Sequence, residues 1–223
     1  MEHKQVPYHN NPGNACALAC YTMVAQYLLP ELNITFGQLG KIAGWNKGYA
    51  VWAFPVWKWL MDKGLYITDY DVIDYDSWAT KGFDSLKGTL AEDEFNFYKE
   101  VTYDLNKVGK QIKLTYRHPN FTYEKKKLSW IDVVTEFNKP GICDLTLNSR
   151  ALNHLEGFIG HRVVLIDITD TEVIFHDPNK KGTGAYRHEP IEHFKTVFEN
   201  IDGPELARYS LEKTWLPSGV NRE

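Results

Sequence analysis

Long apolar runs are missing from this sequence, and so is any excess of basic charge. No stretch reaches the roughly 18 consecutive apolar residues that a membrane-spanning helix needs. The amino terminus lacks the apolar centre of a secretory signal peptide. The formal net charge of −4 gives no basic surface for nucleic acid. We therefore expect a cytoplasmic protein that has neither a nucleic-acid partner nor a membrane partner.

Cysteine is also scarce. The chain has three cysteines, an odd number without the spacing of a disulfide framework, which favours free thiols in a reducing compartment. A zinc site is not indicated, because His188 and His193 are five residues apart, a poor spacing for one helical face, and no closely spaced cysteine pair accompanies them. The sequence predicts no metal and no cofactor, and it does not define the oligomeric state.

A polar, turn-forming loop ends at Cys16, and an apolar helical pattern follows directly. We expect this helix over about 15–29, with Asn14 as its N-cap and Cys16 at its N-terminal tip. Unpaired backbone N–H groups and the helix dipole favour a thiolate at such a tip. Cys16 is therefore predicted to be a nucleophile, whereas Cys20 and Cys143 are predicted to be buried and inert.

The order of the expected elements indicates an α+β fold, because helices dominate the first part of the chain and strands the last part. Further helices are expected at Thr35–Ala43, at Phe54–Asp62, from a capping box at Thr89–Glu92 over Leu90–Val108, from Ser129 to a stop at Pro140–Gly141, and at Ile191–Glu199. Strands are expected at Gln111–Tyr116, Ile142–Leu147, His161–Ile168, Glu172–His176 and Ala207–Trp215.

The chain is expected to form a single domain over residues 1–223. Its helical part covers about 1–68, and its β-sheet part covers about 129–223. Between them, residues 69–128 begin with an acidic section, in which ten acidic residues stand against three lysines up to Asp104. This change of composition favours an insertion or a lid.

A histidine and an aspartate occupy the ends of two neighbouring strands. His161 begins one strand, and Asp177 follows the next one. If the hairpin pairs residues of the same parity, the two side chains lie diagonally across from each other. A two-residue turn at Asp170–Thr171 would give the opposite parity, so this arrangement requires a longer loop or a bulge. His9 and His176 are alternatives to His161 as the base.

These residue types suit nucleophilic acyl chemistry. A thiolate attacks the acyl carbon, an imidazole takes and returns a proton, and a carboxylate fixes the imidazole tautomer. The oxyanion needs donors, which the Cys16 backbone N–H and a side-chain amide just upstream can supply. Asn10 is the best placed amide, and Asn11 and Asn14 are its rivals.

The ordered set of motifs resembles papain-like cysteine peptidases, in particular the branch that processes bacteriocins by removing a double-glycine leader. The shared motifs are Val6-Pro7-Tyr8, Cys16, Cys20, Met23-Val24, Gly160-His161 and Asp177-Pro178. The resemblance covers most of the chain outside about 69–128. Two positions depart from the family pattern, since Asn10 stands where glutamine is expected and Ala17-Leu18 replace Gly-Pro.

This resemblance implies Cys16 as the nucleophile, His161 as the base, Asp177 as its orienter and an amide at position 10 for the oxyanion. It also implies a papain-like α+β fold, in which an N-terminal helical lobe with the nucleophile at a helix N-terminus packs on an antiparallel β-sheet lobe that carries the histidine and the aspartate.

The expected function is that of a cysteine peptidase-like thiol hydrolase. It would cleave a peptide or isopeptide bond in a peptide or protein substrate through a thioester on Cys16. Two alternatives stay open: a transglutaminase-like acyltransferase that uses the same three residues, and a catalytically inactive relative that binds a peptide or a protein partner in the cleft.

Overall fold

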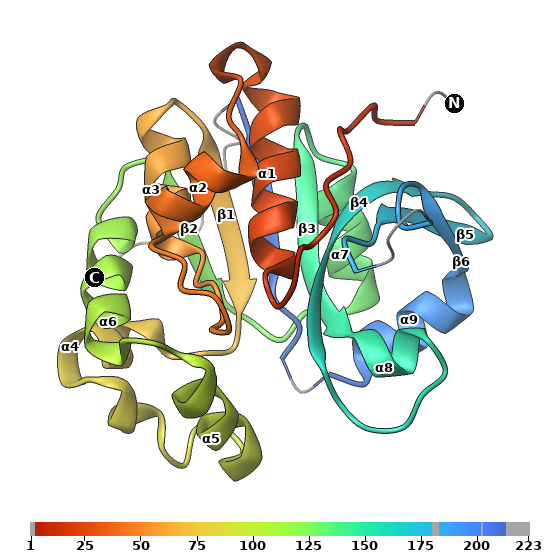
Figure 1. Ribbon diagram of the computed structural model, residues 1–223. Helices are drawn as coiled ribbons and strands as arrows, with labels where there is room; N and C mark the ends of the chain where they lie inside the picture. The colour runs from red at the N-terminus through yellow and green to blue at the C-terminus, as the bar shows by residue number, and fades with distance from the viewer. Residues whose placement is uncertain (1–2, 180–182, 202, 213–223) are drawn as a thin grey trace, which may run out of the picture.

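The computed structural model describes residues 3–179, 183–201 and 203–212, and these residues form one mixed β-sheet with helices on both faces (Figure 1). The strand order is β2-β1-β7-β3-β4-β5-β6. The strands are β1 (Tyr66–Asp71), β2 (Phe121–Lys125), β3 (Ile142–Asn148), β4 (Gly160–Ile168), β5 (Glu172–His176), β6 (Arg187–Pro190) and β7 (Leu206–Ser210). β1 and β2 are parallel, and the other neighbours in the sheet are antiparallel.

Alternate residues of the central strands bury two separate apolar layers, because successive side chains in a strand point to opposite faces. Val164 and Ile166 belong to the core beneath α1 (Cys16–Leu28), α2 (Phe36–Ala43) and α3 (Phe54–Asp62). Val163 and Leu165 belong to the core beneath α7 (Trp130–Phe137), α8 (Ser149–Leu152) and α9 (Ile191–Glu199). β4 is therefore buried on both faces, which places the ends of this strand beside both sets of helices.

The segment between β1 and β2 forms a helical group at one end of the sheet (Figure 1). It contains α4 (Tyr75–Lys81), the short 3-10 helix η2 (Phe83–Leu86), α5 (Glu92–Val101) and α6 (Leu105–Tyr116). Outside this segment, the 3-10 helix η1 (Pro30–Leu32) follows α1. α6 packs against both α3 and α4. None of the helices in the described part of the chain is long and apolar enough to cross a membrane.

Several elements begin and end where the sequence predicts. The Thr35 hydroxyl accepts a hydrogen bond from the Gln38 backbone N–H at the start of α2, and Gly44 ends that helix in the left-handed conformation. α3 and α9 match their predicted ranges, and Ser129 caps α7. The α+β fold class is confirmed, with the cysteine at the N-terminus of a helix that packs on the sheet carrying the histidine and the aspartate.

Other predictions were wrong for local reasons. α1 begins after Ala15, and Asn14 has a left-handed backbone instead of acting as the cap. The predicted capping box at Thr89–Glu92 does not form, since Ala91 is the N-cap of α5. The predicted strand at Gln111–Tyr116 is the end of α6, whose Val108, Ile112 and Thr115 are buried at helical spacing.

Further helices and strands also differ from the predictions. The expected helix over Leu90–Val108 is two helices, because Asp104 caps a new helix by accepting a hydrogen bond from the Lys107 backbone N–H at 2.9 Å. Strands β1, β2 and β6 were not predicted. β7 ends at Ser210, and residues 213–215 of the predicted final strand lie outside the described residues.

The β4–β5 hairpin contains the bulge that the sequence required. Val164 pairs with His176 and Leu165 with Phe175, so residues of the same parity face each other in this part of the hairpin. The register shifts between Leu165 and Asp167, which reconciles this pairing with the short turn. The bulge is what allows His161 and Asp177 to share one face of the hairpin.

Gly141, between α7 and β3, generates the first testable prediction. Its φ is +116°, and a Cβ atom there would collide with the Tyr209 carbonyl oxygen of β7. We expect Gly141→Ala to lower the free energy of unfolding by at least about 1–3 kcal/mol, measured by urea denaturation. Gly37→Ala in α2 is the matched control, since nothing lies within 4 Å of its added Cβ. The control should be neutral or stabilising by about 0.5–1 kcal/mol, and equal stability of the two variants would contradict the packing described.

Candidate active site

A hydrogen-bonded loop delivers Cys16 to the tip of α1. The Asn11 side-chain oxygen accepts hydrogen bonds from the backbone N–H groups of Gly13, at 2.9 Å, and Ala15, at 3.0 Å. These two bonds turn the chain into the helix, and the first helical residue is Cys16, whose thiol is free and half-buried. The N–H groups in the first turn of a helix have no partner within that helix, so they remain available to an anion at this end.

Two bonds fix α1 against β4 next to His161. The Arg162 guanidinium donates from Nη1 to the Tyr21 hydroxyl at 2.5 Å. The Cys20 thiol donates to the Arg162 carbonyl at 3.3 Å. Because Tyr21 and Cys20 are on the helix and Arg162 is on the strand, these contacts hold the segment that carries Cys16 against the segment that carries His161.

The predicted histidine and aspartate form a buried pair. His161 Nε2 lies 2.8 Å from Asp177 Oδ1, and only 1% and 2% of the two side chains is exposed. Asp177 has two more donors: the Asn179 backbone N–H reaches Oδ1 at 3.0 Å, and Arg187 Nη1 reaches Oδ2 at 2.8 Å. Burial alone would raise the pKa of Asp177, but its partners His161, Arg187 and Asn179 lower it overall, which keeps the carboxyl ionised.

The thiol and the imidazole also interact. Burial alone would raise the pKa of Cys16, but the hydrogen bond and charge of His161 lower it overall, helped by backbone N–H groups of Arg162 and Ala17. Burial alone would lower the pKa of His161, but its bonds to Asp177 and Cys16 raise it to about 9. The two shifts go in the directions that favour a thiolate paired with an imidazolium at neutral pH.

The chain segment before the cysteine loop closes over the far side of Asp177. The Asn11 backbone N–H donates to the Pro178 carbonyl at 2.7 Å, and the Tyr8 hydroxyl donates to the Asp177 carbonyl at 3.1 Å. His176 Nε2 lies 2.9 Å from the Val6 carbonyl. Residues 6–11 therefore act as an N-terminal strap that joins the start of the chain to the end of β5.

The three predicted oxyanion amides have different surroundings. Asn10 is exposed, and its amide donates to the Asn11 carbonyl at 3.3 Å. The Asn11 amide donates to Asn179 Oδ1 at 2.6 Å, so it is already used within the site. Asn14 is exposed and has a φ of +45°. The role of Asn10 as the oxyanion donor stays a prediction.

The alternative histidines, His9 and His176, and the other two cysteines are held by packing or by hydrogen bonds outside the Cys16–His161 contact. Besides its contact with Val6, His176 accepts a hydrogen bond from the Tyr186 backbone N–H at 3.0 Å, so both of its ring nitrogens are used. His9 stacks against Phe36, and burial lowers its pKa. Burial raises the pKa of Cys20 well above its usual range and that of Cys143 to about 12.

Sequence reasoning missed Arg187 and Asn179. Arg187 begins β6, a short strand without an apolar pattern, so nothing in the sequence pointed to its contact with Asp177. Asn179 follows Asp177-Pro178, and that turn was the only available signal. Its amide lies 3.2 Å from His161 Nδ1, while Asn11 holds its oxygen. This contact helps to hold the imidazole ring in place.

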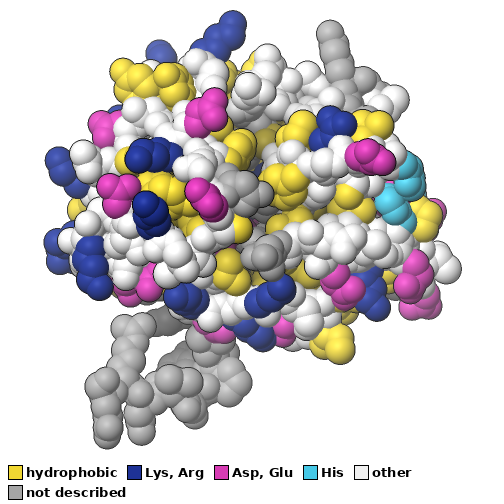
Figure 2. All heavy atoms as spheres, turned by 90° about the horizontal axis from the view of Figure 1, so that it is seen from below, with side chains coloured by type: hydrophobic (Ala, Val, Ile, Leu, Met, Phe, Trp, Pro, Cys, Tyr) yellow, Lys and Arg dark blue, Asp and Glu magenta, His cyan; other side chains and the backbone are white. Residues whose placement is uncertain are grey.

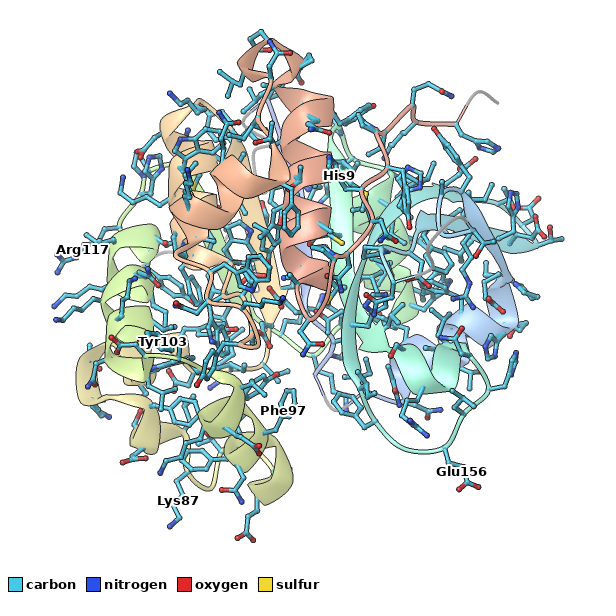
Figure 3. The ribbon with its side chains drawn as sticks, viewed as in Figure 1. His9, Lys87, Phe97, Tyr103, Arg117 and Glu156 are labelled. Atoms are coloured by element: carbon cyan, nitrogen blue, oxygen red, sulfur yellow. The ribbon has the colours of Figure 1, made fainter. Side chains whose placement is uncertain are left out.

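Apolar side chains are exposed on the face seen from below (Figure 2). Leu155, Phe158 and Ile159, in the loop before β4, are each more than half exposed, at 55%, 56% and 51%. In Figure 3, Phe97 on α5 and Glu156 on this loop both lie in the lower part of the view. A separate pocket lies between the α2–α3 loop and α6, and its aromatic lining consists of Trp45, Tyr49, Trp52 and Tyr103. None of the predicted site residues borders this pocket.

The fold and the site combine three features. A half-buried thiol at a helix N-terminus lies beside an imidazole, and a buried carboxylate holds that imidazole from the sheet of this α+β fold. No protein-family model matches the chain, and no curated protein matches it.

Among solved structures, the chain is similar to a double-glycine motif protease from an AMS/PCAT transporter, crystallised in complex with the leader peptide. The identity is 13%, the TM-score is 0.47, and the match covers 94% of each chain. That protein is of the kind that the sequence resembles.

The thiolate–imidazolium pair predicts selective alkylation. At pH 7, iodoacetamide should label Cys16 at least about tenfold faster than an ordinary thiol of pKa near 8.5, because only the thiolate reacts. Cys20 and Cys143 should stay unlabelled in the folded protein. His161→Ala should slow the labelling of Cys16 and move the midpoint of its pH profile upward. Mass spectrometry of the labelled peptides measures this, and equal slow labelling of all three thiols would contradict the pairing.

The carboxylate generates a separate prediction. Asp177→Asn removes the charge that raises the pKa of His161, so the imidazolium should be lost at lower pH and Cys16 should alkylate about tenfold more slowly at pH 7. The control is Asp167→Asn, because Asp167 makes a similar 2.8 Å contact with His3 outside the site. Alkylation in this control should equal that of the unmodified chain. The proposed role of Asp177 is wrong if both variants react at the wild-type rate.

Proposed function

We propose that this chain is a cysteine peptidase-like thiol hydrolase that cleaves a peptide or isopeptide bond through a thioester on Cys16. The observation that supports this most strongly is the connected set of Cys16, His161 and Asp177, in which the pKa of the thiol is lowered and that of the imidazole is raised. Such a set supplies a nucleophile and a general acid–base in one bonded unit.

The first half of the reaction forms the thioester. The Cys16 thiolate attacks the carbonyl carbon of the scissile bond, and the negative charge moves to the carbonyl oxygen. His161 then gives its Nδ1 proton to the leaving nitrogen, because its Nε2 is held by Asp177. The carbon–nitrogen bond breaks, the amine leaves, and the acyl group stays on sulfur. His161 is now neutral.

The second half uses water. Neutral His161 takes a proton from the water molecule as its oxygen attacks the thioester carbonyl, and the carbon–sulfur bond breaks. The carboxylic acid leaves, and the thiolate and imidazolium are restored. Asp177 keeps its charge throughout and stabilises the imidazolium at each stage.

The oxyanion requires donors that point to where the charge develops. The backbone N–H of Cys16 lies at the positive end of α1, where an anion is favoured. We propose Asn10 as the second donor, after a rotation that frees its amide from the Asn11 carbonyl. The second candidate is an inactive relative that binds a peptide. The short side chain of Asn10 favours this candidate if the amide does not rotate toward the oxyanion. An acyltransferase would follow the same first half and use an amine in place of water.

Two features support a peptide substrate and a reducing compartment. Exposed apolar side chains precede β4 in the loop that ends near His161, and they suit an extended chain with apolar residues. The three cysteines are free, as a thiol enzyme of the cytoplasm requires.

A peptide panel tests the hydrolase directly. Fluorogenic peptides, including double-glycine leader sequences and ubiquitin-like carboxyl termini, should be cleaved by the full chain and not by Cys16→Ala. Because both a thiolate and an imidazolium are needed, kcat/KM should rise as the pH rises through the lowered pKa of Cys16, and it should fall as the pH passes about 9, where His161 loses its proton. Cleavage that persists in Cys16→Ala would overturn the mechanism, and products joined to an added amine would identify the acyltransferase.

The oxyanion donor has its own test. Asn10→Ala should lower kcat by about 10²–10³-fold with little change in KM, since the lost bond forms mainly in the transition state. Asn10→Gln restores a longer amide and should keep or increase the activity, whereas Asn14→Ala is the control and should leave kcat unchanged. If kcat is unchanged in Asn10→Ala, Asn10 is not the oxyanion donor.

A further inference from the structure

Three potential metal ligands from separate segments lie close together beside the start of α9. His154 lies in the loop between α8 and β4, Glu189 in β6 and His193 in the first turn of α9. One ligand atom from each residue lies within 4.8 Å of the other two. The two imidazole rings stack with their centroids 4.3 Å apart. Histidine side chains gather at one edge of the face in Figure 2.

One polar atom of this cluster lacks a hydrogen-bond partner within the described structure. His193 Nε2 is buried and has no hydrogen-bond partner. Its nearest acidic atom, Glu189 Oε1, is 3.7 Å away, which is too far for a hydrogen bond. His154 holds a φ of +56°, a conformation that a non-glycine residue adopts at some cost. The buried nitrogen of His193 thus lies near a second imidazole and a carboxylate, and it makes no hydrogen bond to either. A metal ion could use these three groups as ligands.

We propose that His154, Glu189 and His193 bind a divalent transition metal ion of the zinc class. Two imidazole nitrogens and one carboxylate oxygen are a ligand set that Zn²⁺ accepts in tetrahedral geometry, with water in the fourth position. The same set is poor for Mg²⁺ and Ca²⁺, which prefer oxygen ligands. Bond lengths of about 2.0–2.1 Å require ligand atoms about 3.3 Å apart, and rotation of the exposed His154 side chain brings them closer.

A second residue already orients the carboxylate. Arg187 Nη2 donates to Glu189 Oε2 at 3.0 Å, which leaves Oε1 facing His193. Metal ligands are commonly held in this way by an outer partner. The same guanidinium donates from Nη1 to Asp177, so the metal site and the proposed acid–base pair share Arg187. A bound ion would tie the loop that precedes His161 to β6 and α9.

The sequence predicts no metal site, because the spacing of His188 and His193 is poor for one helical face. The structure places His188 in contact with Glu172 at 3.1 Å. His154 is distant in sequence from both, and only the packing of the α8–β4 loop against α9 brings it to His193. His188 therefore supplies a matched control: a half-exposed histidine on the same strand as Glu189 but outside the cluster.

Metal titration of the full chain tests the proposal. The Cys16→Ala background removes the thiolate as a competing ligand and makes the result independent of the proposed peptidase activity. After treatment with a chelator, the protein is titrated with Zn²⁺ against a chromophoric chelator, and with Co²⁺ by visible absorption. We expect one equivalent of Zn²⁺ to bind and the Co²⁺ spectrum to be that of a tetrahedral site. His154→Ala and His193→Ala should each weaken Zn²⁺ binding at least about tenfold, whereas His188→Ala should not.

Two results would overturn the proposal: no stoichiometric Zn²⁺ binding above that of the double variant His154→Ala/His193→Ala, or equal weakening by His188→Ala. His154 is exposed, so its variant should fold even if His193→Ala does not. Urea denaturation with and without Zn²⁺ provides a second measurement. Zn²⁺ should raise the midpoint of the unmodified chain and of His188→Ala, and at the same Zn²⁺ concentration it should raise that of His154→Ala less.

Discussion

The buried contact between His161 and Asp177 is the constraint on which the other features of the site depend. An isolated carboxylate at this depth would take up a proton, and an isolated imidazole would lose one. Together, and with Arg187 behind the carboxylate, each stabilises the charge of the other. The lowered pKa of Cys16 follows from this pair, because the imidazolium is one of the groups that oppose the effect of burying the thiolate.

Much of this arrangement could be predicted from local patterns. Spacing predicts the helix that begins at Cys16 and the two strands that lead from His161 to Asp177. Parity predicts the bulge between these strands. Such features depend on residues close in sequence, and periodicity reports them directly. The exception nearby is Asn14, whose left-handed backbone serves a turn that Asn11 organises.

The remaining features required the three-dimensional structure because they join distant segments. Arg187 contacts Asp177 from a four-residue strand, and β1 and β2 enter the main sheet from either side of an acidic section. Gln111–Tyr116 has strand-forming residues, but its buried positions recur at helical spacing once α3 lies beside it, so packing overrides intrinsic preference. His154 and His193 meet for a similar reason, through loop packing that no periodic pattern encodes.

The N-terminal strap has a consequence for how the protein is made. Its bonds join Val6, Tyr8 and Asn11 to residues about 170 positions later, as the Val6–His176 separation of 170 shows. Contacts of such long range form late, because a long loop must close before they stabilise anything. A ribosome-bound chain has therefore already exposed Cys16 while the partners that activate its sulfur are still unsynthesised. Under the proposed mechanism, the reactivity of the thiol arises only after the residues up to Asp177 have been synthesised and have packed against the strap.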